Sequence, residues 1–407
     1  MYFILQCLYM LVLSITLNAH EIFIPKQFEE EQLIEQVILI SDVDGVIREG
    51  LEATADPRVI QAIKSLLENQ GVDVTFISGT PIENDLTTEP WRRGNVPLSK
   101  VFGCSFKKEL LEDRVAIFGV LGGHCMKADG TMKVVDEYSP EISYELGKLL
   151  IHSFLKEVLH YGSHEQKAIA SNLQMELASL EENHSDHSAN VTAGEFYKIV
   201  KVIREHLDPN FRLLSNGALI ETQTSNPPWG ASIASKWLKE EINQPQHMIS
   251  NLPQSQKQIA TGYVKRAEEG FNYLLICKTN KGLTTKKHIE EKIKHFPKAL
   301  IITIGDTQVD FPMHQNAHIA FHVGLKEVWL NNPLPQCMLV RNFVGKDAQY
   351  VEGTLKILKL LNEAIGKSFF DFKYIPRCDS SGQWDYYSIR EIQLLDNLEF
   401  SDDLTGQ

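Results

Sequence analysis

The sequence predicts an α/β protein with a doubly wound parallel sheet, and three apolar runs support this prediction. Residues 37–40, 72–77 and 299–304 are rich in β-branched side chains, as expected of strands that are covered on both faces. Each run is followed directly by a turn that contains acidic residues, serine or glycine. Because ligands bind at the carboxyl ends of the strands in such sheets, we expect a functional site at these turns.

Two pairs of acidic residues follow the first and the last of these runs. Asp42 and Asp44 lie in the segment DVDG, and Asp306 and Asp310 lie in the segment GDTQVD. Carboxylates gathered at one sheet edge offer the oxygen ligands that Mg²⁺ prefers, so the pattern predicts one magnesium site. A surface loop is the alternative for either segment alone. A calcium-binding loop is excluded, because Gly45 is the fourth residue from Asp42 and not the sixth.

Candidate phosphate-binding groups lie between the two acidic pairs. The hydroxyl of Ser78 and the backbone amide of Gly79, in the turn after the second run, can hold a phosphate oxygen. Lys281 offers a compact positive charge to an acidic group and a phosphoryl group. Lys278, in the same loop, is the alternative lysine.

The segment that contains this lysine predicts a local order of strand, loop, helix and strand over residues 272–304. Lys281 and Gly282 are expected in the loop. The helix is expected to begin behind them, with Thr284 or Thr285 as its N-terminal cap.

Taken in this order, the four segments resemble the motifs of the haloacid dehalogenase superfamily of phosphohydrolases. The resemblance covers a core of about residues 35–80 and 275–365 and implies a Rossmann-like fold. The matching segments are Asp42-Val43-Asp44-Gly45-Val46, Ser78-Gly79-Thr80, Lys281-Gly282 and Gly305-Asp306-Thr307-Gln308-Val309-Asp310.

The resemblance implies a role for each of the polar residues. Asp42 would attack phosphorus and form an aspartyl-phosphate, and Asp44 would protonate the leaving oxygen and then activate water. Ser78, with the amide of Gly79, and Lys281 would bind the phosphoryl group and neutralise its charge.

The resemblance also implies the ligands of the cofactor Mg²⁺. They are Asp42, the backbone carbonyl of Asp44 and Asp306, with Asp310 in or near the shell. Family members with an acid at the position of Asp44 are mostly phosphatases or phosphomutases, so the reaction expected here is phosphoryl transfer.

Residues 81–274 separate the second and third motifs, and they are too many for a loop in a compact domain. They are expected to form an inserted α/β cap domain that sets substrate choice. The segment Gly122-Gly123-His124 is similar to one in trehalose-phosphate phosphatases and Cof-type sugar phosphatases. A small phosphorylated molecule, above all a sugar phosphate, is therefore the expected substrate class.

Residues 213–241 also resemble the stretch in which trehalose-phosphate phosphatases carry a sugar-binding glutamate and then the Lys-Gly pair. Glu221 matches the glutamate, but Trp229 stands where the lysine would be. Lys281 is the better match for the lysine, because its distance from Asp306 fits one helix and one turn. The cap would then carry an extra insertion near residues 243–270.

The beginning of the chain predicts export to the periplasm or out of the cell. Residues 1–19 contain an apolar stretch of signal-peptide length that ends in Leu-Asn-Ala, which resembles a cleavage site. A positively charged N-terminal region is missing, so an uncleaved anchor or a hydrophobic N-terminal strand are the alternatives. No other run is long enough to span a membrane, so no stable span is expected after removal of the signal.

Size and charge narrow the function classes. A chain of 46.2 kDa is long enough for two hydrophobic cores, and residues 366–407 lie beyond both as a C-terminal extension. The net charge of −13 argues against nucleic acid as a partner. The sequence thus predicts an exported, Mg²⁺-dependent phosphatase. The alternatives are a phosphomutase, or a secreted binding or effector protein on the same scaffold.

Overall fold

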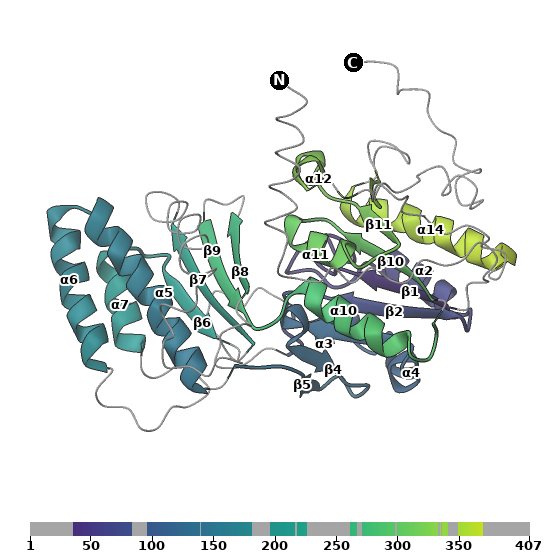
Figure 1. The fold of residues 1–407 in the computed structure, drawn as a ribbon, viewed down its shortest axis with the longest axis horizontal. Helices are drawn as coiled ribbons and strands as arrows, with labels where there is room; N and C mark the ends of the chain where they lie inside the picture. The colour runs from purple at the N-terminus through teal and green to yellow at the C-terminus, as the bar shows by residue number, and fades with distance from the viewer. Residues whose placement is uncertain are drawn as a thin grey trace, which may run out of the picture.

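The computed structural model describes two β-sheets with their covering helices (Figure 1). The ranges that it describes are 36–83, 96–138, 140–180, 196–215, 218–225, 261–266, 271–297, 299–332, 334, 336–340 and 349–368. The predicted signal peptide, most of the predicted C-terminal extension and most of the predicted extra insertion lie outside these residues.

The larger sheet has the strand order β12-β11-β10-β1-β2-β3-β4-β5. All pairings from β12 to β3 are parallel, and only the last two are antiparallel. Its strands are β1 (Gln36–Ser41), β2 (Val72–Ile77), β3 (Val115–Gly119), β4 (His124–Met126), β5 (Met132–Val134), β10 (Ala299–Gly305), β11 (Ile319–His322) and β12 (Cys337–Leu339). The three predicted strands are confirmed as the adjacent strands β10, β1 and β2.

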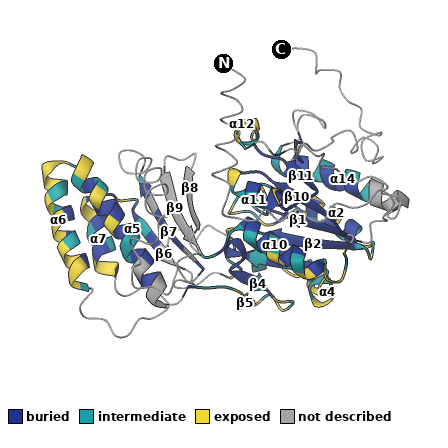
Figure 2. Cartoon of the chain, viewed as in Figure 1, coloured by how far each residue is buried: buried dark blue, intermediate teal, exposed yellow. Residues whose placement is uncertain are grey.

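Helices cover both faces of this sheet, which confirms the doubly wound α/β class. Alternate residues of β1 belong to different cores: Val37 and Leu39 pack with α2 and α14, whereas Ile38 and Ile40 pack with α10 and α11. Figure 2 shows the strands buried between these layers. The helices around this sheet are α2 (Pro57–Leu67), α3 (Leu98–Phe102), α4 (Lys107–Leu111), α10 (Lys281–Lys292), α11 (Phe311–His314), α12 (Lys326–Asn331) and α14 (Tyr350–Ser368).

The second sheet is antiparallel and has the order β6-β7-β9-β8. Its strands are β6 (Arg212–Ser215), β7 (Leu219–Ser225), β8 (Thr261–Arg266) and β9 (Phe271–Cys277). The helices α5 (Pro140–Tyr161), α6 (His164–Ser179) and α7 (Tyr197–His206) lie together on one side of it (Figure 1). Phe154, Phe196 and Phe211 are among the aromatic residues of a separate core between these helices and the sheet.

The boundary of the predicted inserted domain needs a correction. The range 81–274 includes β3, β4 and β5, which pair with β2 and extend the larger sheet. The chain leaves that sheet after β5 and returns to it after β9, at residue 278. Sequence composition did not reveal this, because the pairing of β3 with β2 joins segments that are far apart in the chain.

A search for membrane-spanning helices within the described ranges found none of sufficient length and apolar character.

Candidate active site

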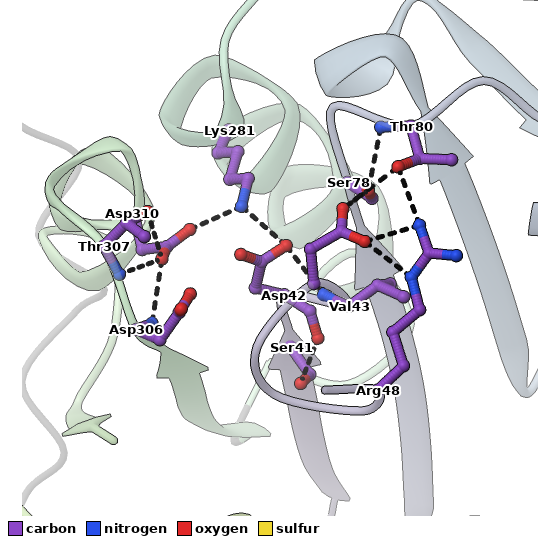
Figure 3. Close-up of polar contacts among 11 residues, drawn as sticks. Ser41, Asp42, Val43, Arg48, Ser78, Thr80, Lys281, Asp306, Thr307 and Asp310 are labelled. Atoms are coloured by element: carbon purple, nitrogen blue, oxygen red, sulfur yellow. Dashed lines mark hydrogen bonds and ion pairs between the residues drawn. The ribbon is translucent and has the colours of Figure 1, made fainter. Parts of the chain in front are cut away.

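The predicted site residues in the turns after β1, β2 and β10 meet at one edge of the larger sheet. In the parallel register, Ser41 lies opposite Phe76 on one side and Ile304 on the other, so the turns after β1, β2 and β10 are neighbours. Figure 3 shows the side chains that these turns bring together, with Lys281 reaching them from the start of α10.

Asp42 is buried, with 3% of its surface exposed. Its Oδ1 accepts a hydrogen bond from the backbone N–H of Val43 at 2.6 Å. The same oxygen lies 2.7 Å from Nζ of Lys281. Both contacts orient the carboxylate at the end of β1.

Lys281 is the first residue of α10, and the helix begins earlier than predicted. The cap is Asn280, whose Oδ1 accepts a hydrogen bond from the N–H of Leu283 at 2.9 Å, so the predicted caps Thr284 and Thr285 were wrong. An asparagine directly before the lysine was the signal that the sequence reading passed over. A cap at this position places Lys281 on the first helical turn, where its side chain reaches the sheet edge.

Of the two candidate lysines, Lys281 faces the acidic residues. Nζ of Lys281 lies 2.5 Å from Oδ1 of Asp310 as well as contacting Asp42. Lys278 instead pairs with Asp136, at 2.8 Å, in the segment where the chain leaves the larger sheet.

Asp42, Asp306 and Asp310 form a compact acidic cluster. Each offers a carboxylate oxygen, and these oxygens all lie within 4.8 Å of one another. Gly45 explains how the loop after β1 approaches so closely: its φ is +79°, and a Cβ there would lie 2.2 Å from Oδ2 of Asp306. Lys281 brings one ammonium to two of these buried carboxylates, those of Asp42 and Asp310. Buried charges are normally paired or bound to metal, so this donor set fits a divalent cation that prefers oxygen.

Asp310 also organises the loop after β10. Its Oδ2 accepts hydrogen bonds from the N–H of Asp306 at 2.9 Å, from the N–H of Thr307 at 2.8 Å and from Oγ1 of Thr307 at 3.1 Å. With Oδ1 on Lys281, both oxygens are engaged. Asp310 therefore fixes Asp306 and Lys281 in position, whether or not it also contacts a cation.

Burial and neighbouring charges shift the pKa values of Asp42, Asp310 and Lys281 in different ways. Burial raises the pKa of the Asp42 carboxyl, the charge of Asp310 raises it further, and Lys281 opposes both effects. Burial also acts to raise the pKa of Asp310, but the charges of Lys281 and His314 and the hydrogen bonds from Lys281 and Thr307 together outweigh it, and the net shift of this pKa is downward. Burial acts to lower the pKa of Lys281, whereas the two carboxylates raise it above its usual value. Lys281 and Asp310 thus form a charged pair, and added positive charge at the site would favour the ionised form of Asp42.

Asp44 points away from this cluster and toward Ser78. Oγ of Ser78 donates to Oδ2 of Asp44 at 2.7 Å, and Oγ1 of Thr80 donates to the same oxygen at 3.0 Å. Oδ1 accepts from Nε of Arg48 at 2.7 Å. The sequence analysis did not single out Arg48, which is fully buried.

Gly79 and Glu221 are the two remaining predicted site residues, and the structure describes the surroundings of Gly79 alone. A Cβ on Gly79 would meet nothing closer than Cδ2 of Leu121, at 3.8 Å, so this position does not require glycine for space. Glu221 lies in β7 of the second sheet, and its side chain lies outside the described part of the structure.

Fold and site together define a class: an α/β protein with an inserted second sheet and a buried carboxylate-lysine centre at the carboxyl ends of parallel strands. No family model and no curated protein matches the chain. Solved structures do match, at low identity. Crystal form 3 of Aspergillus fumigatus trehalose-6-phosphate phosphatase is 11% identical, with a TM-score of 0.44, over 81% of this chain and 94% of that chain.

Two further matches are of similar quality. The Thermotoga maritima protein TM0651 is 12% identical, with a TM-score of 0.39, over 80% of this chain and 97% of that chain. An IMP-bound variant of Plasmodium falciparum IMP-nucleotidase is 14% identical, with a TM-score of 0.39, over 80% of this chain and 67% of that chain. At such identities, function has to be inferred from the residues of the site.

Proposed function

We propose that this protein is a divalent-cation-dependent phosphomonoester hydrolase that works through an aspartyl-phosphate on Asp42. The observation that carries the proposal is the arrangement around this carboxylate. Asp42 is buried at the end of β1, held by Lys281, and grouped with two further carboxylates. A second acid, Asp44, lies two residues further on and contacts a separate hydroxyl group, that of Ser78.

The first step transfers the phosphoryl group to the protein. Both described contacts of the Asp42 carboxylate fall on Oδ1, so Oδ2 is the oxygen that attacks phosphorus (Figure 3). The new bond joins this oxygen to phosphorus, and the bond from phosphorus to the ester oxygen breaks. Asp44 gives a proton to the departing oxygen, which leaves as an alcohol.

The second step releases phosphate. Asp44, now a carboxylate, takes a proton from water, and the resulting hydroxide attacks phosphorus. The bond to Asp42 breaks, and the carboxylate is restored. Across both steps one ester and one water give one alcohol and one phosphate. Lys281 and Ser78 stabilise the charge on the phosphoryl oxygens throughout.

Mg²⁺ is the proposed cation. Asp42 and Asp306 would hold it, with the backbone carbonyl of Asp44, and Asp310 would keep Asp306 in place. When bound, the cation would offset the negative charge of the carboxylates and of the phosphoryl group. This agrees with the raised pKa of Asp42, since added positive charge favours the ionised nucleophile.

A sugar phosphate or a similar small phosphorylated metabolite is the proposed substrate class. Support comes from the resemblance of the motifs and of the Gly122-Gly123-His124 segment to sugar phosphatases. Further support is the inserted second sheet, which provides a separate unit for substrate choice. Export is the proposed location, and it rests on residues 1–19 alone.

The test is phosphate release from a panel of phosphomonoesters, with Mg²⁺ and with a chelator, by the protein from residue 20 onward. Asp42→Asn is expected to abolish release, while Glu49→Gln, which changes an exposed acid in the same loop, is expected to retain it. Acid quenching during turnover should leave a phosphorylated peptide that contains Asp42. Failure to release phosphate from any ester would favour a phosphomutase or a binding or effector role. Conversion of one phosphate ester into its isomer, dependent on a bisphosphate activator and without net release of phosphate, would favour the phosphomutase.

A further inference from the structure

The carboxylate of Asp44 is enclosed by donors of two different kinds. Oδ1 faces the guanidinium of Arg48, with Nε at 2.7 Å and Nη2 at 2.6 Å. Oδ2 faces two hydroxyls, from Ser78 at 2.7 Å and Thr80 at 3.0 Å. Figure 3 shows Arg48, Ser78 and Thr80, the residues that supply these donors, gathered beside one another.

Arg48 is fixed in this position. Its side chain is fully buried, and Nη1 donates to three backbone carbonyls: Leu51 at 3.0 Å, Ala53 at 3.0 Å and Val96 at 2.9 Å. Nη2 also donates to Oγ1 of Thr80, at 3.1 Å. A buried guanidinium with its N–H groups used in this way cannot turn without losing several hydrogen bonds.

The two kinds of donor differ in what they permit. A guanidinium only donates, so Oδ1 of Asp44 cannot carry a proton while it faces Arg48. A hydroxyl can turn and accept, so Oδ2 can carry a proton that points at Ser78, at Thr80 or at a substrate oxygen. The surroundings therefore divide the carboxylate into an anchored oxygen and an oxygen that can exchange protons.

Ser78 links this carboxylate to the phosphate-binding turn. Its Oγ accepts from the backbone N–H of Thr80 at 2.9 Å and donates its one proton to Asp44. If a phosphoryl oxygen accepts the hydrogen bond of the Ser78 hydroxyl, Oδ2 of Asp44 loses one of its two donors. Thr80 then remains as the hydroxyl that holds Oδ2, itself held by Arg48.

We propose that Arg48 and Thr80 are positioning residues that anchor Asp44 through Oδ1 and leave Oδ2 as the oxygen that exchanges protons with the leaving group and with water. This inference rests on the proposed function and adds the residues that make Asp44 effective. It predicts that loss of either residue harms proton transfer more than phosphoryl binding.

The test compares two substrates with different leaving groups. The departing alcohol of an alkyl phosphate needs a proton, whereas p-nitrophenolate leaves as a stable anion. Using kcat/KM restricts the comparison to events up to the first irreversible step, so water attack does not mask the difference. Thr80→Val removes the hydroxyl at nearly constant shape, and Thr80→Ser keeps the hydroxyl. Arg48→Lys keeps the positive charge but lacks the planar set of guanidinium N–H donors.

For Thr80→Val we expect kcat/KM on the best alkyl phosphate of the panel to fall about 10- to 100-fold, within the range that positioned acids contribute. The loss on p-nitrophenyl phosphate should be at least about tenfold smaller, and Thr80→Ser should restore most of the activity. Arg48→Lys should show the same selectivity with a larger loss. Circular dichroism and thermal melts check that each variant folds. If Arg48→Lys does not fold, the comparison of Thr80→Val with Thr80→Ser still tests the positioning role.

The outcomes separate this inference from the function on which it rests. If wild type is active and Thr80→Val loses both substrates equally, or loses neither, the positioning role is wrong. If Thr80→Ser is as impaired as Thr80→Val, the hydroxyl is not responsible and the role is again wrong. If wild type releases phosphate from neither ester, the proposed function fails, and the inference fails with it.

Discussion

Replacement of Gly45 by alanine should disable the acidic cluster at a moderate cost in stability. A non-glycine residue at the φ of +79° seen at Gly45 costs about 1–2 kcal/mol. The new Cβ would lie 2.2 Å from Oδ2 of Asp306, whereas ordinary contact begins at 3.4 Å. The carboxylate of Asp306 must therefore move by more than about 1 Å, and a misplacement of that size can cost about 100-fold in turnover.

A matched control separates the two effects. Gly130 has a φ of +85°, but a Cβ there would meet nothing within 4 Å. Gly130→Ala should show the same cost of backbone strain, about 1–2 kcal/mol by denaturant unfolding, with normal activity. The assay is phosphate release over a Mg²⁺ titration, together with the rise in melting temperature that Mg²⁺ produces. We expect Gly45→Ala to lose about 100-fold in kcat/KM and to need more Mg²⁺. Equal activity and equal Mg²⁺ response in the two variants would refute the argument that Asp306 is placed by this close approach.

Two further predictions concern buried charge. Lys281→Met leaves the buried carboxylates of Asp42 and Asp310 without its ammonium, so it should lower the free energy of unfolding by about 3–5 kcal/mol, partly restored by Mg²⁺. A change below about 1 kcal/mol would contradict the pairing. Burial lowers the pKa of His288 from 6.5 to about 4, so neutral His288 stabilises the fold above the unfolded pKa, and this stability is lost as pH falls from 6.5 toward 4. In melts between pH 7.5 and 4.5, His288→Gln should lose about 3 kcal/mol less unfolding free energy than the wild type does. The control His295→Gln, at an exposed position, should keep the wild-type dependence of stability on pH. The same pH dependence in the wild type and both variants would refute the assignment.

The strands and most of the site were predictable from local sequence. Parallel strands that are covered on both faces need apolar, β-branched residues throughout, and β1 and β10 carry that composition without interruption. Polar residues directly after such runs must lie at the carboxyl edge, so Asp42 and Asp306 were placed by adjacency alone.

The surroundings of Asp44 were not predictable in the same way. Arg48 follows Asp44 by four residues, and nothing local indicates that it is fully buried. Among its hydrogen-bond partners are the carbonyl of Val96 and the hydroxyl of Thr80, which only the fold brings to it from other parts of the chain. The extent of the larger sheet was missed for the same kind of reason, because β3 joins it only by pairing with β2.

By itself, the sequence determined the strands, the acidic turns after them and the order of the four motifs, because hydrophobic pattern and adjacency act over a few residues. The sequence favoured Lys281 but left Lys278 open, and the tertiary structure brings Lys281 to Asp42. Only the tertiary structure shows that the Asp44 side chain turns toward Ser78 instead of the acidic cluster. Each of these outcomes depends on hydrogen bonds and ion pairs between segments that are distant in the chain. Such contacts form only where several elements converge, and no local pattern encodes that convergence.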